Sequence, residues 1–425
     1  MRKMKDSGVA WLESIPETWN LLQLGSLFLE HKHKNVGMQS SNLLSLSYGK
    51  IIQKNINATD GLLPESFEGY NVIDAGDIVL RLTDLQNDQR SLRVGLCGES
   101  GIITSAYTTL RRRNDALNSK YFYYLLHSYD IRKGFYGMGA GVRQGLNYAG
   151  VRKIMLTVPP ESEQTAIAEC LDRKTAQVDA LISNVQAQIE KLKAYKQSLI
   201  TEIVTNGLDP TVPMKDSSVE WIGKMPAHWD INRIKYVSDF APTCNTDTLT
   251  QDSVVAYAPM ECIKNGYFER RSARYGSLAH TLTPFQNGDI VMAKVTPCFE
   301  NGNIAVMKNL DSDYGLGSSE LFVFRPRKIF TQYLMYWLQN QLFVRYACAT
   351  MTGTGGLKRV SPVFVRGCNI HTPPVAEQKE IAAYLDTKCA EIDQLIAVKQ
   401  SKIEKLEQNK RSLIYEYVTG KKEVS

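Results

Sequence analysis

The chain has 425 residues, 43% of them hydrophobic, a formal net charge of +6 and an isoelectric point near 8.7. This length predicts two to four domains, and the hydrophobic content excludes a largely disordered chain. No apolar run approaches the ~20 residues that a membrane-spanning helix needs, and the charged N-terminus lacks the apolar stretch of a secretory signal. The mild basic excess is compatible with a polyanionic partner but does not require one.

The positions of the cysteines and histidines indicate the cellular compartment and argue against a metal site. Eight cysteines are spread along the chain without a Cys-x-x-Cys pair, which is typical of reduced thiols in a cytoplasmic protein. His31 and His33 stand close together, but a zinc site needs more clustered ligands, so we interpret them as a solvated pair in a loop. We therefore expect a cytoplasmic protein with no membrane segment and no metal site.

The sequence is written twice. The segments Lys5–Trp19 and Lys215–Trp229 share Lys-Asp-Ser, Val, Trp, Pro and Trp at identical spacing. Further matches follow in the same order, with Gly-Asp-Ile-Val at 76–79 and 288–291, Tyr-x-x-Tyr-x-Leu at 121–126 and 333–338, and Pro-Pro, Glu-Gln and Ile-Ala at 159–168 and 373–382. The offset drifts only from 210 to 214 residues along the chain. Chance does not supply so many ordered matches, which indicates a tandem duplication.

Each half begins with a part that mixes short apolar runs with glycine, asparagine, aspartate and proline breaks. These runs predict strands over Asp77–Leu82, Arg93–Cys97 and Ser105–Leu110, with counterparts over Ile290–Val295, Ile304–Lys308 and Leu321–Phe324. One amphipathic helix is predicted in each half, at Ser119–Tyr129 and Thr331–Tyr346. The pattern is that of a compact α+β domain.

Each half ends in a long predicted helix. Glu161–Asn206 contains neither glycine nor proline, and Glu377–Thr419 is its copy. Pro-Pro precedes both helices, where proline is tolerated, and Gly207 and Gly420 follow them as C-caps. Apolar residues in steps of three, four and seven predict a coiled-coil seam, made of Ile167, Leu171, Val178, Leu181, Val185, Ile189, Leu192, Leu199 and Ile203, and of Ile381, Leu385, Ile392, Leu395, Ile403, Leu406, Leu413 and Tyr417.

The two seams predict the architecture. Lys399 takes the position of Val185 and is the one residue that breaks the repeated pattern. An isolated helix of ~40 residues is marginal in water, so matching seams predict two helices that bury each other. If they pair antiparallel, a pseudo-twofold axis relates two similar α+β domains that the helices separate. The expected boundaries are 1–158, a helix at 159–207, 208–372 and a helix at 373–425. A coiled coil that binds a partner instead of its own copy is the alternative.

The halves differ in two pairs of loops. Residues 81–93 and 294–303 follow the shared Gly-Asp-Ile-Val strand, and the glycine-rich segments 137–146 and 352–359 precede the last strand of each half. Both pairs contain side chains that can contact base edges or phosphate, although any solvated loop can have this composition. The candidate DNA-contacting residues are Arg81, Gln86, Asn87, Arg90, Arg143 and Gln144 in the first half, and Lys294, Thr296, Asn301, Asn303, Lys358 and Arg359 in the second.

Several segments look like enzyme motifs but lack the residues or flanks that define them. The glycines at 137–141 follow a predicted helix instead of a strand, which argues against a dinucleotide-binding loop, and no Gly-x-x-x-x-Gly-Lys-Ser/Thr is found. Val158–Glu161 has the wrong flanks for an amino-methyltransferase motif. Glu377-Gln378-Lys379 resembles the end of a nuclease site, but its copy has Thr165 in place of the lysine, and the helix dipole favours a first-turn glutamate. We expect no catalytic residues and no cofactor in this chain.

Taken together, these features resemble the specificity subunits of type I restriction–modification systems. The Trp-Pro-Trp lead-in, Gly-Asp-Ile-Val, the glycine-rich turn and Pro-Pro followed by Glu-Gln-x-x-Ile-Ala all occur twice, over essentially the whole chain. The resemblance implies that each α+β domain is a target recognition domain reading one half of a bipartite, asymmetric site in double-stranded DNA. It also implies that the helix pair sets the gap between half-sites, at roughly one turn of DNA, ~34 Å.

The resemblance further implies partner subunits. Two methyltransferase (modification) subunits, which bind S-adenosylmethionine and flip the target adenine, would dock on the helices and their ends. Restriction subunits using ATP and Mg would complete a translocating nuclease, so this chain would supply specificity and no catalysis. Two alternatives stay open: a specificity subunit of a fused methylase–nuclease, and a coiled-coil scaffold without sequence-specific DNA binding. The scaffold gives no reason for loops to differ between the halves.

Overall fold

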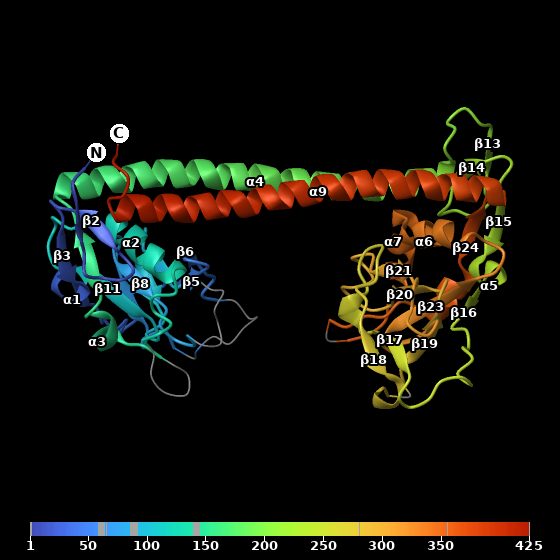
Figure 1. Cartoon of the computed structure of the whole chain (residues 1–425), viewed down its shortest axis with the longest axis horizontal. Coiled ribbons are helices and arrows are strands. Elements are labelled where there is room, and N and C mark those ends of the chain that lie inside the picture. The colour runs from blue at the N-terminus through green and yellow to red at the C-terminus, as the bar shows by residue number, and fades with distance from the viewer. Residues whose placement is uncertain are drawn as a thin grey trace. The chain divides into compact units, whose positions relative to one another are not determined.

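The computed structural model describes residues 2–57, 64, 66–85, 92–138, 145–279, 281–354 and 356–424. They form two compact units, one made of Met1–Val185 with Ser401–Ser425 and the other of Gln186–Gln400. There are two long helices, α4 (Glu161–Asn206) and α9 (Val375–Val418) (Figure 1). Each has one part in the first unit and the other part in the second. The two long helices expected from the duplicated seams are therefore present.

The first unit is built on an antiparallel sheet with the strand order β4-β11-β8-β9. Ile78 and Leu80 of β8 face the larger core, and Val79 faces a smaller one on the other side of the sheet. Burial on both faces explains why this strand is a continuous apolar run in the sequence. The strands are β4 (Phe28–Glu30), β11 (Thr108–Arg112), β8 (Ile78–Leu80) and β9 (Val94–Leu96).

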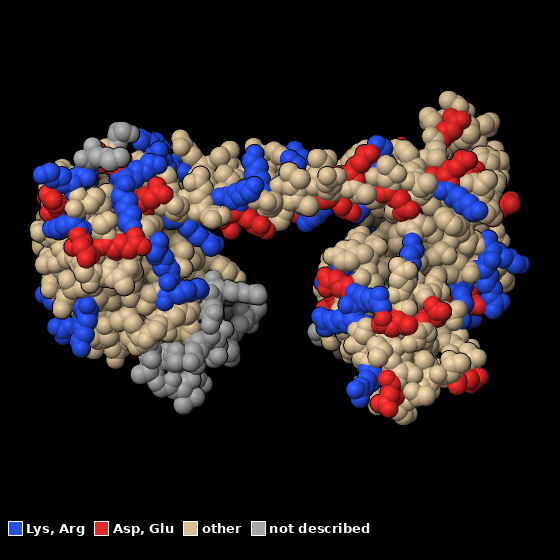
Figure 2. Space-filling view, viewed as in Figure 1, with Lys and Arg blue, Asp and Glu red and all other residues tan. Residues whose placement is uncertain are grey.

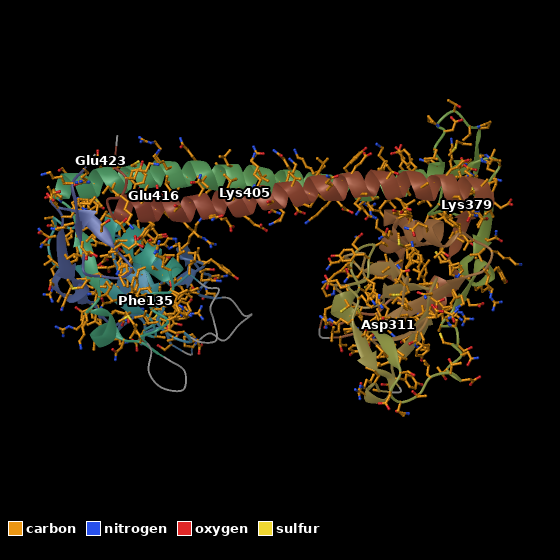
Figure 3. The ribbon with its side chains drawn as sticks, viewed as in Figure 1. Phe135, Asp311, Lys379, Lys405, Glu416 and Glu423 are labelled. Carbon is orange, nitrogen blue, oxygen red and sulfur yellow. The ribbon has the colours of Figure 1, made fainter. Side chains whose placement is uncertain are left out.

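Helix α2 (Ser119–Ile131) covers the larger core of this unit (Figure 1). Asn118 caps it by accepting hydrogen bonds from two amides of the first turn. Phe135, in the turn after α2, is fully buried and meets Tyr129 edge-on at 5.0 Å between ring centroids (Figure 3). The remaining elements are the strand pairs β1 (Met4–Asp6)/β2 (Ser14–Pro16), β3 (Asn20–Gln23)/β12 (Met155–Val158), β5 (Leu44–Ser47)/β6 (Lys50–Gln53) and β7 (Asn71–Ile73)/β10 (Gly101–Ile103), with α1 (Leu24–Leu27) and α3 (Tyr148–Val151).

The second unit repeats this plan. Its sheet has the order β16-β23-β20-β21, in which β16 (Ser238–Phe240), β23 (Leu321–Pro326), β20 (Ile290–Ala293) and β21 (Ile304–Val306) take the places of β4, β11, β8 and β9. The strands predicted in both halves are thus confirmed. The second unit adds a sheet of order β18-β17-β22-β19, made of β18 (Ser272–Arg274), β17 (Val254–Ala258), β22 (Tyr314–Gly317) and β19 (Thr283–Gln286). Its other elements are β13 (Met214–Asp216)/β14 (Lys224–Pro226), β15 (Asp230–Arg233)/β24 (Asn369–Thr372), α5 (Ile234–Val237), α8 (Pro362–Gly367) and two 3₁₀ turns, η1 (Met260–Cys262) and η2 (Tyr275–Ser277).

One predicted helix of the second half is two helices. The segment Thr331–Tyr346 was expected to be continuous, but α6 (Thr331–Gln339) ends at Asn340 and α7 (Gln341–Ala349) begins after it. Asn340 has an extended backbone, and its side chain accepts a hydrogen bond from the amide of Phe343 at 2.8 Å. Asparagine favours helix caps over helix interiors for this reason, and the single-helix prediction was wrong at this residue.

The long helices pair with each other inside each unit. In the second unit Gln188 meets Lys399, and further along α4 Lys196 meets Asp393, so the partners on α9 run in the opposite direction. Lys399, which breaks the seam pattern, donates to Gln188 Oε1 at 2.5 Å. In the first unit Lys410 donates to both carboxylate oxygens of Asp179, at 2.6 and 2.7 Å. Cys170, earlier on α4, hydrogen-bonds with Tyr417, later on α9. The helix pair is therefore antiparallel in both units, as the duplicated seams predict.

Two seam assignments made from the sequence were wrong. Leu181 and Leu395 are each 51% exposed. The residues that turn inward are their neighbours Ile182 and Ile396, which are partly buried. The seam alternates steps of four and three, so the step from Val178 leads to position 182, and a residue one place earlier lies about 100° round the helix.

The other predicted seam residues are buried or partly buried, including Ile189 and Ile403 at the middle of the pair. None of the described helices contains an apolar stretch long enough to cross a bilayer. Figure 2 shows lysine, arginine and acidic side chains interspersed on the visible surface of α4 and α9.

Candidate nucleic-acid interface

The structure brings the two divergent segments of each half together. In the first unit the amide of Leu146 donates to the carbonyl of Leu82 at 2.9 Å. In the second unit the amide of Val360 donates to the carbonyl of Lys294, also at 2.9 Å. These two hydrogen bonds join equivalent positions of the duplication. The two divergent segments therefore meet at the same end of the corresponding sheet in each unit.

In the second unit the two segments form one connected surface. The amide of Thr296 donates to the carbonyl of Lys358 at 3.0 Å, and the Thr296 hydroxyl donates to the carbonyl of Gly356 at 2.8 Å while accepting from the amide of Lys358 at 3.0 Å. A cis peptide bond follows, between Thr296 and Pro297. The amides of Asn301 and Asn303 donate to carbonyls within the same loop, at 3.0 and 3.1 Å. The backbone of this surface is thus held by its own hydrogen bonds.

An acidic residue lies between two of the predicted DNA-contacting cations. Arg359 donates two hydrogen bonds to the carboxylate of Glu320, at 2.9 and 2.7 Å, and the pKa of Glu320 lies below its usual value mainly because of them. Lys294 donates to the carbonyl of Ser319 at 2.6 Å and lies 3.9 Å from Glu320. Lys358 is exposed. Acidic and basic side chains also stand side by side on the visible face of this unit (Figure 2).

In the first unit only part of the predicted site can be placed. Arg81 is half-buried, and its amide donates to the carbonyl of Arg93 at 2.9 Å. The other candidates lie outside the described residues and remain predictions: Gln86, Asn87, Arg90, Arg143 and Gln144.

Arg93 supports the loop in which Arg81 stands, a role that the sequence analysis missed. Its side chain is fully buried, and its Nη1 donates to the carbonyls of Arg81 and Thr83, at 3.1 and 2.6 Å. Its Nη2 donates to the carbonyl of Asp84 at 3.2 Å. An arginine at the start of an otherwise apolar strand was the available signal, because a buried guanidinium needs several acceptors.

A buried carboxylate stands next to this arginine. Asp130 of α2 accepts a hydrogen bond from the amide of Arg93 at 2.6 Å. Burial raises the pKa of Asp130 to about 6, although that hydrogen bond and the charge of Arg93 oppose the rise. The end of the first divergent loop is therefore fixed from inside the domain by a polar group of α2.

The opposite end of the sheet is the same in both units. Arg111 of β11 donates two hydrogen bonds to Asp77, at 2.8 and 2.6 Å. Arg325 of β23 donates two to Asp289, both at 2.8 Å. The hydrogen bonds to Asp289 raise the pKa of Arg325. This bidentate pair ties the two central strands together and belongs to the shared framework, because it does not vary between the halves.

The helix starts also have a structural role in both copies. Trp19 donates its indole hydrogen to Glu163 at 2.9 Å, and Trp229 donates to Glu377 at 3.0 Å. The glutamines that follow accept hydrogen bonds from the amides that open α2 and α6. Lys379, labelled in Figure 3, is exposed near the start of α9. The Glu-Gln-Lys sequence therefore anchors the lead-in segment to the helix and does not resemble a nuclease site in three dimensions.

The described residues also lack the clustered ligands of a metal site. They contain no group of three or more histidine, cysteine, aspartate or glutamate side chains placed to hold a metal ion. Burial raises the pKa of Cys97 to about 11, which keeps this thiol protonated at neutral pH. What the geometry offers is a polar, hydrogen-bonding surface at one end of each sheet.

Comparison with known proteins identifies this arrangement. Residues 16–191 and 226–408 each match the family described as the type I restriction modification DNA specificity domain. The two matches cover most of the chain, and the chain therefore belongs to this family, with two copies of the domain.

Full-length relatives give the kind of subunit. The chain is 24% identical over 426 residues to the MjaVIII type I specificity subunit of Methanocaldococcus jannaschii, which covers 96% of this chain and 93% of that protein. It is 26% identical over 212 residues to the EcoEI specificity subunit of Escherichia coli, over 49% of this chain and 35% of that protein. Specificity subunits are the non-catalytic members of type I systems, and this chain is a subunit of that kind.

A solved structure shares the fold. A chain in a structure on the complex assembly and conformational transition of the type I R-M system aligns with a TM-score of 0.68 and 15% identity, over 95% of this chain and 98% of that one. The two chains therefore share one fold over nearly their whole length.

Proposed function

We propose that this chain reads a bipartite, asymmetric sequence in double-stranded DNA, with one half-site for each unit. The observation that supports the proposal most is the convergence of both divergent segments at one end of a sheet whose strand order and arginine–aspartate pair are the same in the two units. Two half-sites of different sequence require surfaces that differ where bases are contacted and agree elsewhere. A scaffold protein has no such requirement.

The candidate base contacts follow from side-chain chemistry. Arginine and lysine suit guanine, asparagine and glutamine suit adenine, and threonine can contact either a base edge or phosphate. In the second unit we propose Lys294, Thr296, Asn301, Asn303, Lys358 and Arg359. In the first we propose Arg81, Gln86, Asn87, Arg90, Arg143 and Gln144.

We further propose that the helix pair sets the spacing of the half-sites and docks two methyltransferase subunits, with restriction subunits joining the complex. Leu181 and Leu395 support this role, because they are equivalent positions of the duplication and both expose half of a large apolar side chain on a helix. The domain boundaries at 158, 207 and 372 belong to the same proposal. All eight cysteines are free, which suits a reducing cytoplasmic location.

Mapping methyl-adenine across the genome of cells that express the chain with its methyltransferase subunits tests the proposal. We expect two half-sites of different sequence at a fixed separation. A palindromic motif or the absence of a motif would contradict it. Removing matched heptads from both helices should change the separation and leave the half-sites unchanged, and altered half-sites would argue against the spacing role.

Co-purification distinguishes the fused alternative. Separate methyltransferase and restriction chains are expected with a type I subunit, whereas one chain with both activities would place the protein in a fused methylase–nuclease system. A scaffold would form its complexes without any sequence-dependent DNA binding.

A further inference from the structure

A hairpin in the first unit lies against the divergent loop and is not among the predicted contacts. Strands β5 and β6 are joined by the two-residue turn Tyr48-Gly49. The turn is packed on the segment where the divergent loop returns to the sheet, since a Cβ on Gly49 would lie 3.0 Å from Leu92 Cβ and 3.5 Å from the carbonyl oxygen of Val94. The hairpin tip therefore packs against the described end of the divergent loop, at Leu92.

The residue at this tip is unusual for its conformation. Tyr48 has φ of +46° and Gly49 has φ of +78°, the two left-handed residues of a type I′ turn. Asparagine and glycine are favoured at the first of these positions, and a bulky aromatic residue is strained there. The Tyr48 side chain is nevertheless 78% exposed, so it does not stabilise the core. A strained, exposed tyrosine points to a function outside the fold.

The second unit has a hairpin turn at the corresponding place, enclosed by the antiparallel bridge between Ile263 and Phe268. The amide of Gly266 donates to the carbonyl of Ile304 at 2.8 Å, and Asn265 Nδ2 donates to the carbonyl of Asn301 at 3.2 Å. Ile304 begins the strand that corresponds to the one begun by Val94. Tyr267, next to this turn, is 57% exposed. Each unit therefore places an exposed tyrosine on a hairpin beside its divergent loop.

We propose that these two hairpin tips are a third DNA-contacting element of each unit, with Tyr48 and Tyr267 placed against the groove of their half-sites. The inference rests on the proposed function and adds residues that neither divergent segment contains. A tyrosine ring offers a flat apolar face to bases or sugars and a hydroxyl to phosphate or a base edge. Lys50 is exposed two residues after Tyr48 and supplies a cation to the same surface.

Turn chemistry supplies a clean test. Tyr48→Asn replaces the strained residue by the one that a type I′ turn prefers, so folding should be unchanged or improved. Affinity of the full-length subunit should fall about tenfold for a duplex with the mapped methylation motif, measured by fluorescence anisotropy. The fall should vanish on a duplex whose first half-site is scrambled. Tyr48→Phe keeps the ring and should retain most of the affinity, and Tyr267→Thr should act through the second half-site.

The outcomes separate this inference from the proposed function. Unchanged affinity of Tyr48→Asn, with wild-type discrimination between motif and scrambled duplexes, would overturn the inference alone. Loss of methyltransferase-subunit binding with intact DNA affinity would also overturn it and assign the tip to a protein interface. A wild-type subunit, alone or with its methyltransferase subunits, that does not distinguish the duplexes would overturn the proposed function and the inference together.

Discussion

The two units support their variable loops in different ways. Both attach a variable surface to the same sheet end, and both close the other end with an arginine–aspartate pair. In the first unit a buried side chain, Arg93, holds the start of the variable loop from inside the domain. In the second unit the equivalent position is Asn303, and the loop is held by hydrogen bonds from Thr296 to the neighbouring segment. A shared framework thus leaves each loop free to acquire its own support.

The contrast extends to the interface between domain and helices. The hydroxyl of Tyr121 donates to the carbonyl of Val418 at 3.0 Å, near the end of α9. Its counterpart Tyr333 lies 3.4 Å from the carbonyl of Val204, near the end of α4. The neighbour of the first tyrosine is Thr157, whereas the residue at the same position in the second unit is His371. The units share the tyrosine but differ in a group that can titrate.

Replacing Arg93 should have the largest effect, because it removes a support that only the first unit has. Arg93→Met leaves the partly buried carbonyls of Arg81, Thr83 and Asp84 without this donor, so we expect the free energy of unfolding of the first unit to fall by about 3 kcal/mol. Affinity for the first half-site should fall with it. Thermal unfolding and DNA binding measure both effects. Asn303→Met at the equivalent position is the control and should cost less than about 1 kcal/mol, and equal losses in the two variants would show that the loops are supported alike.

Acid should act on the second unit through His371. Burial lowers the pKa of this histidine to about 4. The unfolded chain therefore takes up the proton first as the pH falls, and stability should be lost between about pH 6.5 and 4, by up to about 3 kcal/mol. Trp337 donates its indole hydrogen to His371 Nδ1 at 3.1 Å, so tryptophan fluorescence during urea unfolding can follow the change. His371→Thr, which copies Thr157 of the first unit, should flatten this pH dependence. A variant that keeps the wild-type slope would rule His371 out as its source.

Charges on the variable surface should tune DNA affinity. We expect Arg359→Ala to weaken binding to the second half-site by about 1–3 kcal/mol, and Arg143→Ala to do the same at the first. Glu320→Gln should strengthen binding and steepen its salt dependence, because it releases Arg359 and Lys294 from a carboxylate. Binding titrations at several salt concentrations measure all three. An unchanged affinity and salt slope in Glu320→Gln would argue that the two cations do not face DNA.

The smallest effect is expected at two equivalent ion pairs between the long helices, one in each unit. Asp179→Asn and Asp393→Asn each remove one of two equivalent, partly exposed ion pairs between the helices, with Lys410 and Lys196. Each should cost about 0.5 kcal/mol, since solvent screens such pairs. Double-mutant cycles with the matching lysine-to-methionine variants measure the coupling. Unequal coupling energies would show that the helix pair is less symmetric than its sequence.

Hydrophobic periodicity was enough to predict the strands and the long helices, because each element depends on its own pattern of burial. It was less reliable where the pattern allowed two choices. Leu181 and Ile182 are both apolar, and only packing against α9 decides which turns inward. The break at Asn340 depends on one side chain capping a helix, which competes locally with helix continuation.

The sequence by itself determined the duplication, the class of fold and the positions at which the halves differ, since these depend on the order and spacing of residues. Only the tertiary structure decided which differing segments meet. Hydrogen bonds between distant segments, such as Val360 to Lys294, bring two loops to one surface, and the hairpin with Tyr48 packs against the end of a divergent loop in the first unit although nothing in its local pattern indicates it. Contacts between residues far apart in the chain leave no periodic signal, so the fold had to be seen before the candidate interface could be outlined.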